Sequence, residues 1–535
     1  MTLDPALEAR ARAWLDDDPD PVTRAELGEL LAHDHEELAR RFDGRLQFGT
    51  AGLRGAMAAG PMRMNRVTVR RAAAGLARYL LDTQPDARRR GIVVGFDGRH
   101  HSEVFALDSV RVFVGAGLPV HLLETPAPTP VVAFATKHLA AVAGVVVTAS
   151  HNPPADNGYK VFLEDGSQIV PPHDIGIAAC IDAVRRLGEV PLGDASARTV
   201  HRVRAGELAA YLARVPRVRH RPDVREACVA YTAMHGVGAD VVDAAFAAAG
   251  FDPVHHVDAQ RRPDGDFPTV AFPNPEEPGA MDLLLARARE VGADVALAND
   301  PDADRLGVAI PTADGGWRPL RGDEVGWLLA DHLLRHTTGG DRLVVTTLVS
   351  SSLLADMAAA HGVRHMETPT GFKWIAQAIR DRPECRFLFG YEQALGYLVT
   401  DEPRDKDGIT AAVLFTEVVA LARYDGVTLE DRLDAIAARF GRHHTAERSL
   451  RMEPAVAAAA VTALEAAPPT EVAGVAVQSV SMPVPGLVRL MLEGGGRLQV
   501  RPSGTEPKVK VYAETVGTDP APLLDDLVGR LQALA

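Results

Sequence analysis

Lysine and cysteine are scarce in this sequence of 535 residues. Only six of its 57 lysine and arginine residues are lysines, namely Lys137, Lys160, Lys373, Lys406, Lys508 and Lys510. Because arginine carries nearly all the positive charge, the positions that keep lysine are candidates for a compact, titratable ammonium group. The three cysteines lie far apart and form no C-x-x-C motif. This excludes a disulfide framework and a cysteine-rich zinc site, and it favours a reducing, cytoplasmic compartment.

An excess of positive charge and long apolar runs are absent as well. The net charge is -14 at pH 7 and the pI is about 5.8, whereas binding to nucleic acid needs a basic face. The longest apolar stretch, residues 139–149, is too short to span a bilayer, and residues 1–19 show no signal peptide. We therefore expect no nucleic-acid or membrane partner. A small-molecule partner and a monomer or homodimer are further expectations, which do not follow from charge.

The composition, 47% hydrophobic and 24% charged, is that of a globular protein, and the length predicts several domains of ~100–200 residues each. Helices are expected within residues 1–45, at 72–81 and at 103–117, and strands at 91–96, 142–147 and 159–163. This alternation predicts an α/β layer with a parallel or mixed sheet. A new domain is expected at an arginine-rich linker, residues 214–226. We predict domain I over residues 1–213, domain II over 214–321, domain III over 322–441 and a smaller α+β domain IV over 442–535.

The most informative motif is Thr148-Ala-Ser150-His151-Asn-Pro-Pro154, which directly follows an apolar run of seven residues. Such a run predicts a buried parallel strand that places Ser150 at the carboxyl edge of the sheet, where ligands of α/β proteins bind. The two prolines prevent a helix from starting there, so Ser150 and His151 are expected on a fixed loop. Ser150 is a candidate nucleophile or phosphate carrier. The alternative is an ordinary strand-to-turn junction.

A second motif, Asn299-Asp300-Pro-Asp302-Ala-Asp304-Arg305, follows a predicted strand at residues 295–298. Three carboxylates at alternate positions can converge on one hard cation, and Mg²⁺ prefers such oxygen ligands. The motif is no EF-hand loop, because its sixth position is arginine and its twelfth is proline. The alternatives are a solvated acidic turn or an ion-pair network around Arg305. In the functional interpretation, Arg305 holds a phosphate beside the metal.

A third motif, Arg501-Pro-Ser503-Gly504-Thr505-Glu-Pro-Lys508, combines a guanidinium, hydroxyls and a tight turn. These groups suit a dianionic phosphate, although a plain turn is the alternative. No Walker loop occurs in the chain, so ATP is not indicated.

Weaker signals come from loops that could equally be ordinary surface loops. Gly49–Gly55 carries a central Arg54, Gly390-Tyr-Glu392 places a carboxylate beside aromatic residues, and Arg404–Gly408 holds Lys406 between two aspartates. Gly236-Val-Gly238 lacks the third glycine of a dinucleotide fingerprint and is interpreted as a strand–turn–helix junction.

Taken together and in this order, the motifs resemble the α-D-phosphohexomutase superfamily, which comprises phosphoglucomutase and phosphomannomutase enzymes. The likeness extends over residues 46–515. It implies an α/β fold with four domains around a central cleft: three related α/β domains with mixed sheets and a smaller C-terminal α+β domain. The last domain is then expected to move over the cleft.

The resemblance also implies a role for each matching residue. Ser150 matches the phosphoserine, and it is counted among the metal ligands together with Asp300, Asp302 and Asp304. The other implied catalytic residues are Arg54, His151, Lys160, Arg305 and Lys406, the last as a general acid/base. The implied substrate-binding residues are Gly390, Glu392, Lys373, Arg501, Ser503, Gly504, Thr505 and Lys508.

The implied activity is reversible transfer of a phosphoryl group between the 1- and 6-positions of a hexose, with glucose phosphates as the expected substrate. It implies Mg²⁺ as cofactor and glucose 1,6-bisphosphate as intermediate and activator. The loop around Glu392 lacks the serine of many bacterial enzymes and is more similar to the branch that includes phosphopentomutase. Mannose and pentose phosphates therefore stay open, as do a metal-dependent sugar phosphatase and a non-enzymatic phosphosugar-binding protein.

Overall fold

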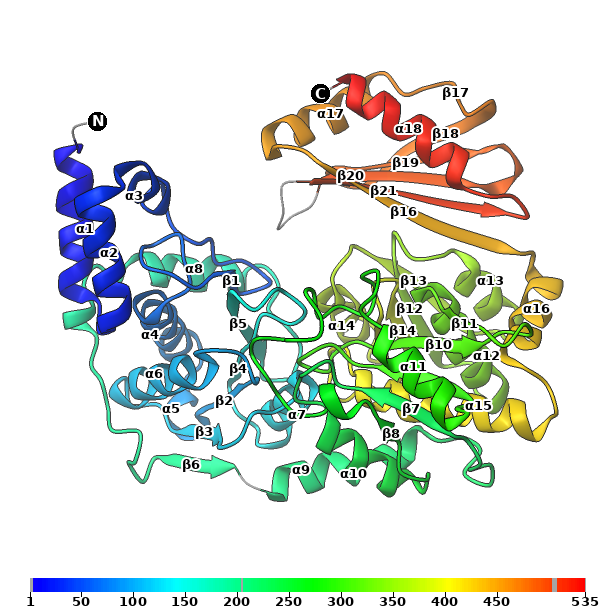
Figure 1. The fold of residues 1–535 in the computed structure, drawn as a ribbon, viewed down its shortest axis with the longest axis horizontal. Helices are drawn as coiled ribbons and strands as arrows, with labels where there is room; N and C mark the ends of the chain where they lie inside the picture. The colour runs from blue at the N-terminus through cyan, green and yellow to red at the C-terminus, as the bar shows by residue number, and fades with distance from the viewer. Residues whose placement is uncertain (1–2, 204, 503–507, 535) are drawn as a thin grey trace. The chain divides into compact units, whose positions relative to one another are not determined.

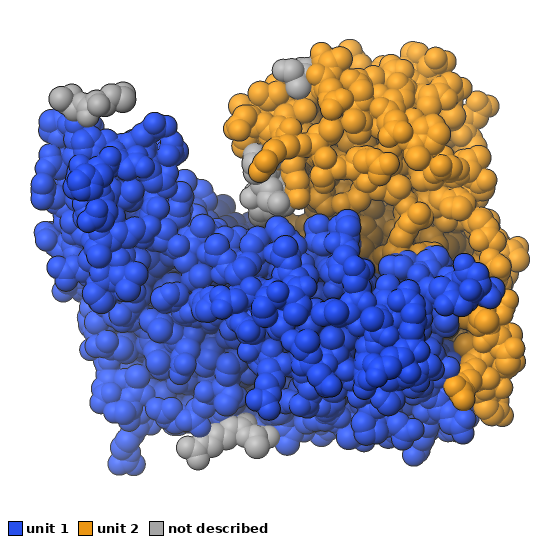
Figure 2. Space-filling view, in the orientation of Figure 1, with its two compact units in different colours: residues 1–320, 395–421 blue, residues 321–394, 422–535 orange. Residues whose placement is uncertain are grey.

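The computed structural model describes residues 3–203, 205–502 and 508–534. The chain forms two compact units, which have different colours in Figure 2. Unit 1 consists of residues 1–320 and 395–421, and unit 2 of residues 321–394 and 422–535. Among the described residues, no helix combines the length and the apolar character needed to cross a bilayer.

Three helices form the first part of unit 1, as predicted (Figure 1). They are α1 (Pro5–Asp17), α2 (Pro21–His33) and α3 (His35–Arg41). An aspartate precedes each helix and accepts a hydrogen bond from a backbone N–H of its first turn: Asp4, Asp20 and Asp34. Trp14 and Leu27 are buried in a small core that these helices share with the following segment.

A mixed six-stranded sheet follows in unit 1, in the order β1-β5-β4-β2-β3-β6. Its strands are β1 (Leu53–Ala56), β2 (Ile92–Phe96), β3 (Val120–Leu123), β4 (Ala143–Val147), β5 (Asp156–Leu163) and β6 (Val200–Val203). Its helices are α4 (Arg66–Thr83), α5 (Ala87–Arg90), α6 (Ser102–Gly115), α7 (Thr129–His138), α8 (His173–Asp182) and α9 (Ala205–Leu212). Strands β4, β2, β3 and β6 are parallel, and β5 is antiparallel to β4 and β1. Every residue of β2 and β4 is buried, which is typical of strands covered on both faces.

The second sheet of unit 1 has the order β11-β10-β9-β7-β8. Its strands are β7 (Val229–Thr232), β8 (His255–His256), β9 (Val295–Ala298), β10 (Gly307–Pro311) and β11 (Trp317–Pro319). Its helices are α10 (Ala239–Ala249) and α11 (Asp282–Val291), and the chain later returns as β15 (Gly396–Leu398) and α15 (Gly408–Tyr424). Strands β9 and β10 are antiparallel neighbours. The loop between them, residues 299–306, contains the aspartate motif and is called the acidic loop below.

Unit 2 begins with a parallel sheet in which β12 (Arg342–Thr347) lies between β13 (Arg364–Thr368) and β14 (Arg386–Glu392). Its helices are α12 (Gly322–His336), α13 (Leu353–Ala360), α14 (Phe372–Arg380) and α16 (Leu429–Phe440).

The C-terminal part of unit 2 is an antiparallel sheet in the order β16-β21-β20-β19-β18-β17, as an α+β domain requires. Its strands are β16 (His443–Arg451), β17 (Glu471–Val472), β18 (Val475–Val484), β19 (Leu487–Leu492), β20 (Arg497–Pro502) and β21 (Lys508–Val516). Helices α17 (Pro454–Ala466) and α18 (Ala521–Leu534) share its apolar core. Short 3-10 helices in the chain are η1 (Leu187–Glu189), η2 (Val215–Val218), η3 (Asp258–Gln260) and η4 (Glu493–Gly495).

A buried polar cluster within unit 2 joins this sheet to the start of α13. The Glu514 carboxylate accepts hydrogen bonds from Ser351 Oγ at 2.5 Å, the Ser352 N–H at 3.0 Å and Arg497 Nε at 2.6 Å, and its Oε1 lies 2.9 Å from His443 Nδ1. Burial opposes ionisation, but these donors hold the pKa of Glu514 at about 2. A charged carboxylate thus links two segments of unit 2.

Asp323, at the start of α12, has the opposite shift. Its carboxylate accepts hydrogen bonds from the Ser351 N–H at 2.8 Å and the Tyr391 hydroxyl at 2.9 Å. Burial nevertheless raises the pKa of Asp323 to about 6, and the nearby charge of Glu514 adds to the increase. The charged form of Asp323 therefore lowers the stability of the fold at neutral pH.

We expect Asp323→Asn to stabilise the protein at pH 7.5, by up to about 3 kcal/mol, because the amide oxygen can accept the same hydrogen bonds without a charge. The folded-state pKa is raised, so the wild-type fold takes up a proton as the pH falls through 6. The difference in unfolding free energy should therefore shrink below pH 6 and disappear near pH 4. Urea unfolding at several pH values measures it. Asp356→Asn, on the exposed face of α13, is the control, and a difference that does not change with pH would contradict the prediction.

Candidate active site

Ser150 lies three residues beyond Val147, the last residue of β4, at the edge of the sheet where parallel strands end. Its backbone is left-handed, with φ of 55°, which is uncommon for any residue other than glycine and frequent at functional sites. The buried guanidinium of Arg99 holds the loop, because it donates hydrogen bonds to the carbonyls of Ser150 at 2.5 Å, Asn152 at 2.6 Å and Pro153 at 2.9 Å. Ser150 is therefore fixed in position.

The acidic loop between β9 and β10 contains three carboxylates with no exposed surface, those of Asp300, Asp302 and Asp304. The loop is closed by Asn299, whose amide donates a hydrogen bond to the Arg305 carbonyl at 2.6 Å, and the Asn299 oxygen accepts one from the Tyr231 hydroxyl at 2.7 Å. The alternative of a solvated acidic turn is wrong, since all three carboxylates are removed from water.

The three carboxylates fit a hard divalent cation. One oxygen from each lies within 4.8 Å of the other two, as ligands of a single ion require. Among the described residues, Asp300 Oδ2 and Asp304 Oδ1 are buried and have no hydrogen-bond partner. Buried carboxylate oxygens without partners are costly unless a cation neutralises them. An oxygen-only donor set is the one that Mg²⁺ and similar ions prefer.

The serine loop and the acidic loop meet directly. Ser150 Oγ donates a hydrogen bond to Asp302 Oδ1 at 2.9 Å. Lys160, on β5, places Nζ 3.2 Å from Ser150 Oγ, 2.7 Å from Asp302 Oδ2 and 2.9 Å from Asp304 Oδ2. A candidate nucleophile, a metal-binding group and a cation thus share one buried position.

Lys406 joins the site from the segment between β15 and α15. Its ammonium lies 3.1 Å from Asp304 Oδ2 and 3.5 Å from Asp405 Oδ1. The other acidic neighbour, Asp407, accepts a hydrogen bond from the Tyr211 hydroxyl and caps the start of α15. Lys406 is therefore held by the acidic loop and one of its two sequence neighbours.

The neighbouring charges shift the pKa values of the carboxylates in opposite directions. Burial opposes the charge of Asp302, but the ammonium of Lys160 outweighs it and lowers the pKa of Asp302. Burial and the charges of Asp302 and Asp304 raise the pKa of Asp300 well above its ordinary value. The same two carboxylates raise the pKa of Lys160 despite its burial. The neighbouring groups therefore favour the charged form of Asp302 and disfavour that of Asp300.

His151, Arg305 and Arg54 surround the meeting point of the two loops. His151 Nδ1 lies 4.0 Å from Asp300 Oδ2, and burial together with the cationic Arg305 and Arg54 lowers the pKa of His151 well below its ordinary value. Arg305 Nε lies 4.0 Å from Asp304 Oδ1, whereas the ammonium of Lys160 lies closer to the carboxylates, at 2.7 Å from Asp302 and 2.9 Å from Asp304. Arg54 is exposed and donates a hydrogen bond to Asn152.

Close backbone contacts explain two of the glycines near the motifs. A Cβ on Gly408 would lie 2.2 Å from the Arg305 carbonyl oxygen, and one on Gly236 would lie 2.3 Å from Pro301. Both glycines let a neighbouring segment pack against the acidic loop. This agrees with the interpretation of residues 236–238 as a strand–turn–helix junction.

Two residues that support the site were not predicted. Arg99 follows β2 and holds the serine loop, and Thr129 begins α7. The Thr129 hydroxyl donates a hydrogen bond to Asp302 Oδ2 at 2.6 Å, and its N–H donates one to the Asp302 carbonyl at 2.9 Å. Arg99 follows β2 and Thr129 follows β3, and both strands end at the same sheet edge as β4. This position after a parallel strand is the feature from which their role could have been predicted.

We expect Thr129→Val to weaken the binding of Mn²⁺, used as a spectroscopic substitute for Mg²⁺, by about tenfold. The substitution keeps the shape of the side chain but removes the donor that orients Asp302 Oδ2, and loss of such a supporting bond costs about 10- to 100-fold in metal affinity. Electron paramagnetic resonance of free Mn²⁺ measures the affinity. Thr129→Ser keeps the hydroxyl and should bind as the wild type does. Equal affinities of the Val and Ser variants would contradict the prediction.

Within unit 2, the structure brings together three of the predicted substrate-binding residues. Glu392 Oε1 accepts a hydrogen bond from the Gly371 N–H at 2.7 Å, at the N-terminus of α14, where Lys373 also lies. Gly390 precedes Glu392 on β14 and packs against Ile375 of α14.

The third motif is described in part. Arg501, on β20, donates a hydrogen bond to the Tyr512 hydroxyl at 3.2 Å, and Lys508 begins the adjacent antiparallel strand β21. Ser503, Gly504 and Thr505 lie outside the described residues.

None of the six lysine side chains is exposed. Lys160 and Lys406 are buried, and the other four are half-buried, Lys137 in an ion pair with Glu402 at 2.5 Å. Five of the six lysines lie in or beside the predicted motifs. This agrees with the idea that the chain keeps lysine where a compact ammonium group is needed.

The chain matches four family models in the order of the domains predicted above. They describe phosphoglucomutase/phosphomannomutase α/β/α domain I over residues 45–187, α/β/α domain II over 209–315, α/β/α domain III over 321–440 and the C-terminal domain over 451–524. The fold and the site therefore define a four-domain enzyme of the mutase class, which combines phosphotransferase and isomerase chemistry.

Individual relatives agree with these matches. "Probable phosphomannomutase" of Haemophilus influenzae is 43% identical over 476 residues, 86% of this chain and 94% of that protein. "Phosphopentomutase" of Mus musculus is 34% identical over 594 residues, 99% of this chain and 95% of that protein. A phosphoglucomutase/phosphomannomutase family protein of Burkholderia thailandensis shares the fold, with a TM-score of 0.71 at 21% identity over 91% of this chain and 97% of that chain. The chain belongs to the phosphoglucomutase/phosphomannomutase family of the α-D-phosphohexomutase superfamily.

Proposed function

We propose that this enzyme moves a phosphoryl group reversibly between the 1- and 6-positions of a hexose, with glucose 1-phosphate and glucose 6-phosphate as the preferred pair. The hydrogen bond from Ser150 Oγ to Asp302 Oδ1 carries the proposal, because it places a hydroxyl nucleophile beside the carboxylates that suit a metal. Ser150 carries the phosphoryl group between the two half-reactions, and glucose 1,6-bisphosphate is the intermediate.

In the first half-reaction the bond between phosphorus and Ser150 Oγ breaks while a substrate hydroxyl oxygen forms its bond to the same phosphorus. The hydroxyl proton leaves the sugar oxygen, and Lys406 is our candidate for exchanging it. The second half-reaction reverses these events at the other sugar position. Lys160 and Arg305 hold the transferring group.

Asp300, Asp302 and Asp304, with Ser150, are the proposed ligands of Mg²⁺, which would supply positive charge as the phosphoryl group moves. His151 and Arg54 orient the serine loop and the incoming phosphate. Glu392, Gly390 and Lys373 bind the sugar. Arg501, Ser503, Gly504, Thr505 and Lys508 bind the phosphate that does not react.

A phosphate-binding loop for the non-reacting phosphate favours a mutase over a phosphatase, since hydrolysis needs only one phosphate site. Specificity for glucose rests on weaker support, because relatives of similar coverage are named for mannose and for pentose phosphates. Phosphomannomutase or phosphopentomutase activity is the second candidate.

A panel of sugar 1-phosphates, with and without glucose 1,6-bisphosphate, tests the proposal. The panel contains glucose, mannose, glucosamine, ribose and deoxyribose 1-phosphates. We expect the highest kcat/KM for glucose 1-phosphate and activation by the bisphosphate. A higher kcat/KM for ribose 1-phosphate would replace glucose by a pentose, and steady release of inorganic phosphate would indicate a phosphatase. Binding without turnover would refute an enzymatic role.

We further propose a cytoplasmic monomer or homodimer with domains over residues 1–213, 214–321, 322–441 and 442–535. Light scattering of the purified protein tests the oligomeric state.

A further inference from the structure

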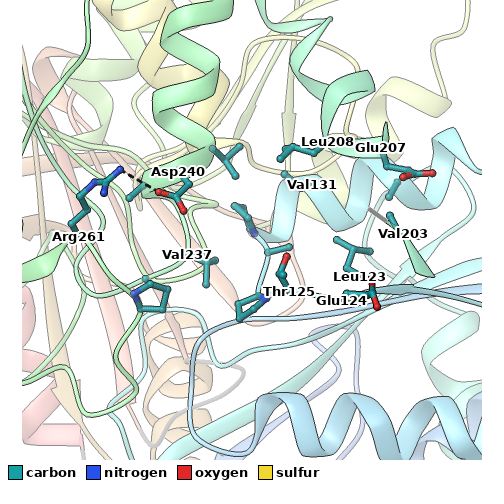
Figure 3. Close-up of a pocket in the computed structure, with 18 residues that line it drawn as sticks. Leu123, Glu124, Thr125, Val131, Val203, Glu207, Leu208, Val237, Asp240 and Arg261 are labelled. Carbon is teal, nitrogen blue, oxygen red and sulfur yellow. Dashed lines mark hydrogen bonds and ion pairs between the residues drawn. The ribbon is translucent and has the colours of Figure 1, made fainter. Parts of the chain in front are cut away.

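A pocket of about 540 Å³ lies within unit 1, away from the residues assigned above (Figure 3). One side is formed by the end of β3, the segment that leads into α7, and the first turn of α9. The other side is formed by the start of α10, the turn before it and the segment around Arg261 and Pro263. Its volume suits a single small organic molecule.

The middle of the pocket is apolar and its two ends are polar. Figure 3 shows Val237, Leu208 and Val131 between the ends. The proline, valine and leucine side chains of the lining suit an apolar body such as an aromatic ring. The hydrophobic effect therefore favours occupation of this part by an apolar group.

The polar ends carry mainly negative charge. At one end Asp240 is paired with Arg261 at 3.3 Å, and at the other Glu124 is paired with Arg202 at 2.8 Å. Glu207, in the first turn of α9, lines the same pocket and is half-buried. Its charge acts on His121, and it makes no hydrogen bond or ion pair with the residues that the structure describes. A half-buried carboxylate in the lining of a pocket favours a cationic ligand and disfavours a phosphate.

The walls of the pocket are bonded to the acidic loop. Pro128 lines the pocket, and the next residue, Thr129, donates its hydroxyl and its N–H to Asp302. Val237, on the opposite wall, donates its N–H to the Pro301 carbonyl at 2.8 Å. A molecule that separates or draws together the two walls would therefore act on the acidic loop through the bonds of Thr129 and Val237.

We propose that this pocket binds a small organic cation with a flat apolar body and an amine, and that its occupancy changes the affinity of the acidic loop for a divalent metal. The amine pairs with Glu207, and the apolar body contacts Val237, Leu208 and Val131. Binding at one site and metal affinity at the other are coupled through Thr129 and Val237, and this coupling is reciprocal.

Tryptamine is a suitable probe, since it joins a flat apolar ring to a primary ammonium group. Tryptophol and indole-3-propionate have the same ring with a neutral and an anionic end, respectively. Isothermal titration calorimetry of the full-length protein should show one tryptamine site, with indole-3-propionate at least about tenfold weaker. Equal affinity for all three indoles would overturn the assignment to an acidic pocket, and so would the absence of tryptamine binding.

Two variants locate the site. Glu207→Gln should weaken tryptamine binding by about fivefold, because it removes the charge and keeps the side-chain shape. Leu208→Trp should abolish binding by filling the pocket from the half-exposed face of α9. Glu226→Gln removes an exposed carboxylate elsewhere in unit 1 and should bind as the wild type does. If Leu208→Trp does not fold, Glu207→Gln decides, and unchanged binding in that variant would overturn the proposal.

The coupling has its own measurement. Saturating tryptamine should change the Kd for Mn²⁺ by about fivefold or more, within the usual range for coupled sites. Glu207→Gln at the same tryptamine concentration should show a smaller change. An unchanged Kd for Mn²⁺ in a protein that binds tryptamine would refute the coupling. Neither measurement depends on turnover, so failure of this proposal is distinguishable from failure of the proposed mutase activity.

Discussion

Ser150→Ala is expected to lower mutase activity by at least about 10⁴-fold while leaving the fold intact. Removal of a nucleophile that forms a covalent intermediate lowers the catalytic rate by a factor of this order. Binding and electrostatic contacts alone cannot replace the missing covalent bond. The substitution removes only Oγ, whose partners in the structure are Asp302 and Lys160. Alanine tolerates the left-handed backbone at this position about as well as serine does, so little strain is added.

Activity with glucose 1-phosphate and added glucose 1,6-bisphosphate measures this loss. Intact-mass spectrometry of the purified protein gives a second result, since a phosphorylated fraction of the wild type should be missing from the variant. Ser196→Ala, in an exposed turn of unit 1, is the matched control for loss of a serine hydroxyl. Wild-type activity of Ser150→Ala would show that the phosphoryl group does not pass through Ser150.

Asp302→Asn should have the second-largest effect. We expect Mn²⁺ binding at least about 100-fold weaker and activity at least about 10³-fold lower. Asp302 accepts hydrogen bonds from Ser150 Oγ, Thr129 Oγ1 and Lys160 Nζ. Asparagine has one amide oxygen in place of two carboxylate oxygens, and it carries no negative charge. The variant therefore loses a metal ligand and the charge that pairs with the ammonium of Lys160.

The two readouts separate the causes of this effect. Electron paramagnetic resonance reports the affinity for Mn²⁺, and circular dichroism shows that the protein is folded. Asp314→Asn lies in an exposed turn between β10 and β11 and controls for the change of charge. Unchanged affinity for Mn²⁺ in Asp302→Asn would place the metal elsewhere.

The fold was predictable where apolar periodicity is strong. The predicted strand at residues 295–298 is β9, and the predicted strand at residues 91–96 is β2. Strand β16 was missed because its sequence, HHTAERSLR, is polar and lacks a regular apolar face. Its nine residues pair with β21, so tertiary pairing and not local preference makes it a strand.

Helix α4 shows a different limit. It was predicted to begin at residue 72 but begins at Arg66, where Asn65 caps it. Arg66 and Arg70 both bond Asp108 of α6, and this pairing makes a polar first turn compatible with a buried helix. From the sequence alone, Arg66 and Arg70 are expected to face the solvent. Their partner, Asp108, lies about 40 residues away and forms no local motif with them.

The site shows the same division. Ser150 and the three aspartates could be singled out from the sequence because each motif follows a strand of buried residues. Arg99 and Thr129 were missed because each is a single residue without a local motif, and only the shared sheet edge brings them to the loops. From the sequence, Lys406 lies between two aspartates of its own segment. The structure pairs it with one of these, Asp405, and also with Asp304, about 100 residues earlier.

The covered lysines make this protein unusually suited to chemical footprinting. With six lysine amines in the chain and none of them fully exposed, an acylating reagent would modify few side chains, and each could be followed separately by peptide mass spectrometry. Lys160 and Lys406 border the acidic loop, while Lys137 is held by Glu402 and serves as an internal reference. Slower acylation of the first two in the presence of a sugar phosphate would report the arrival of the ligand, without any need for the reaction to proceed.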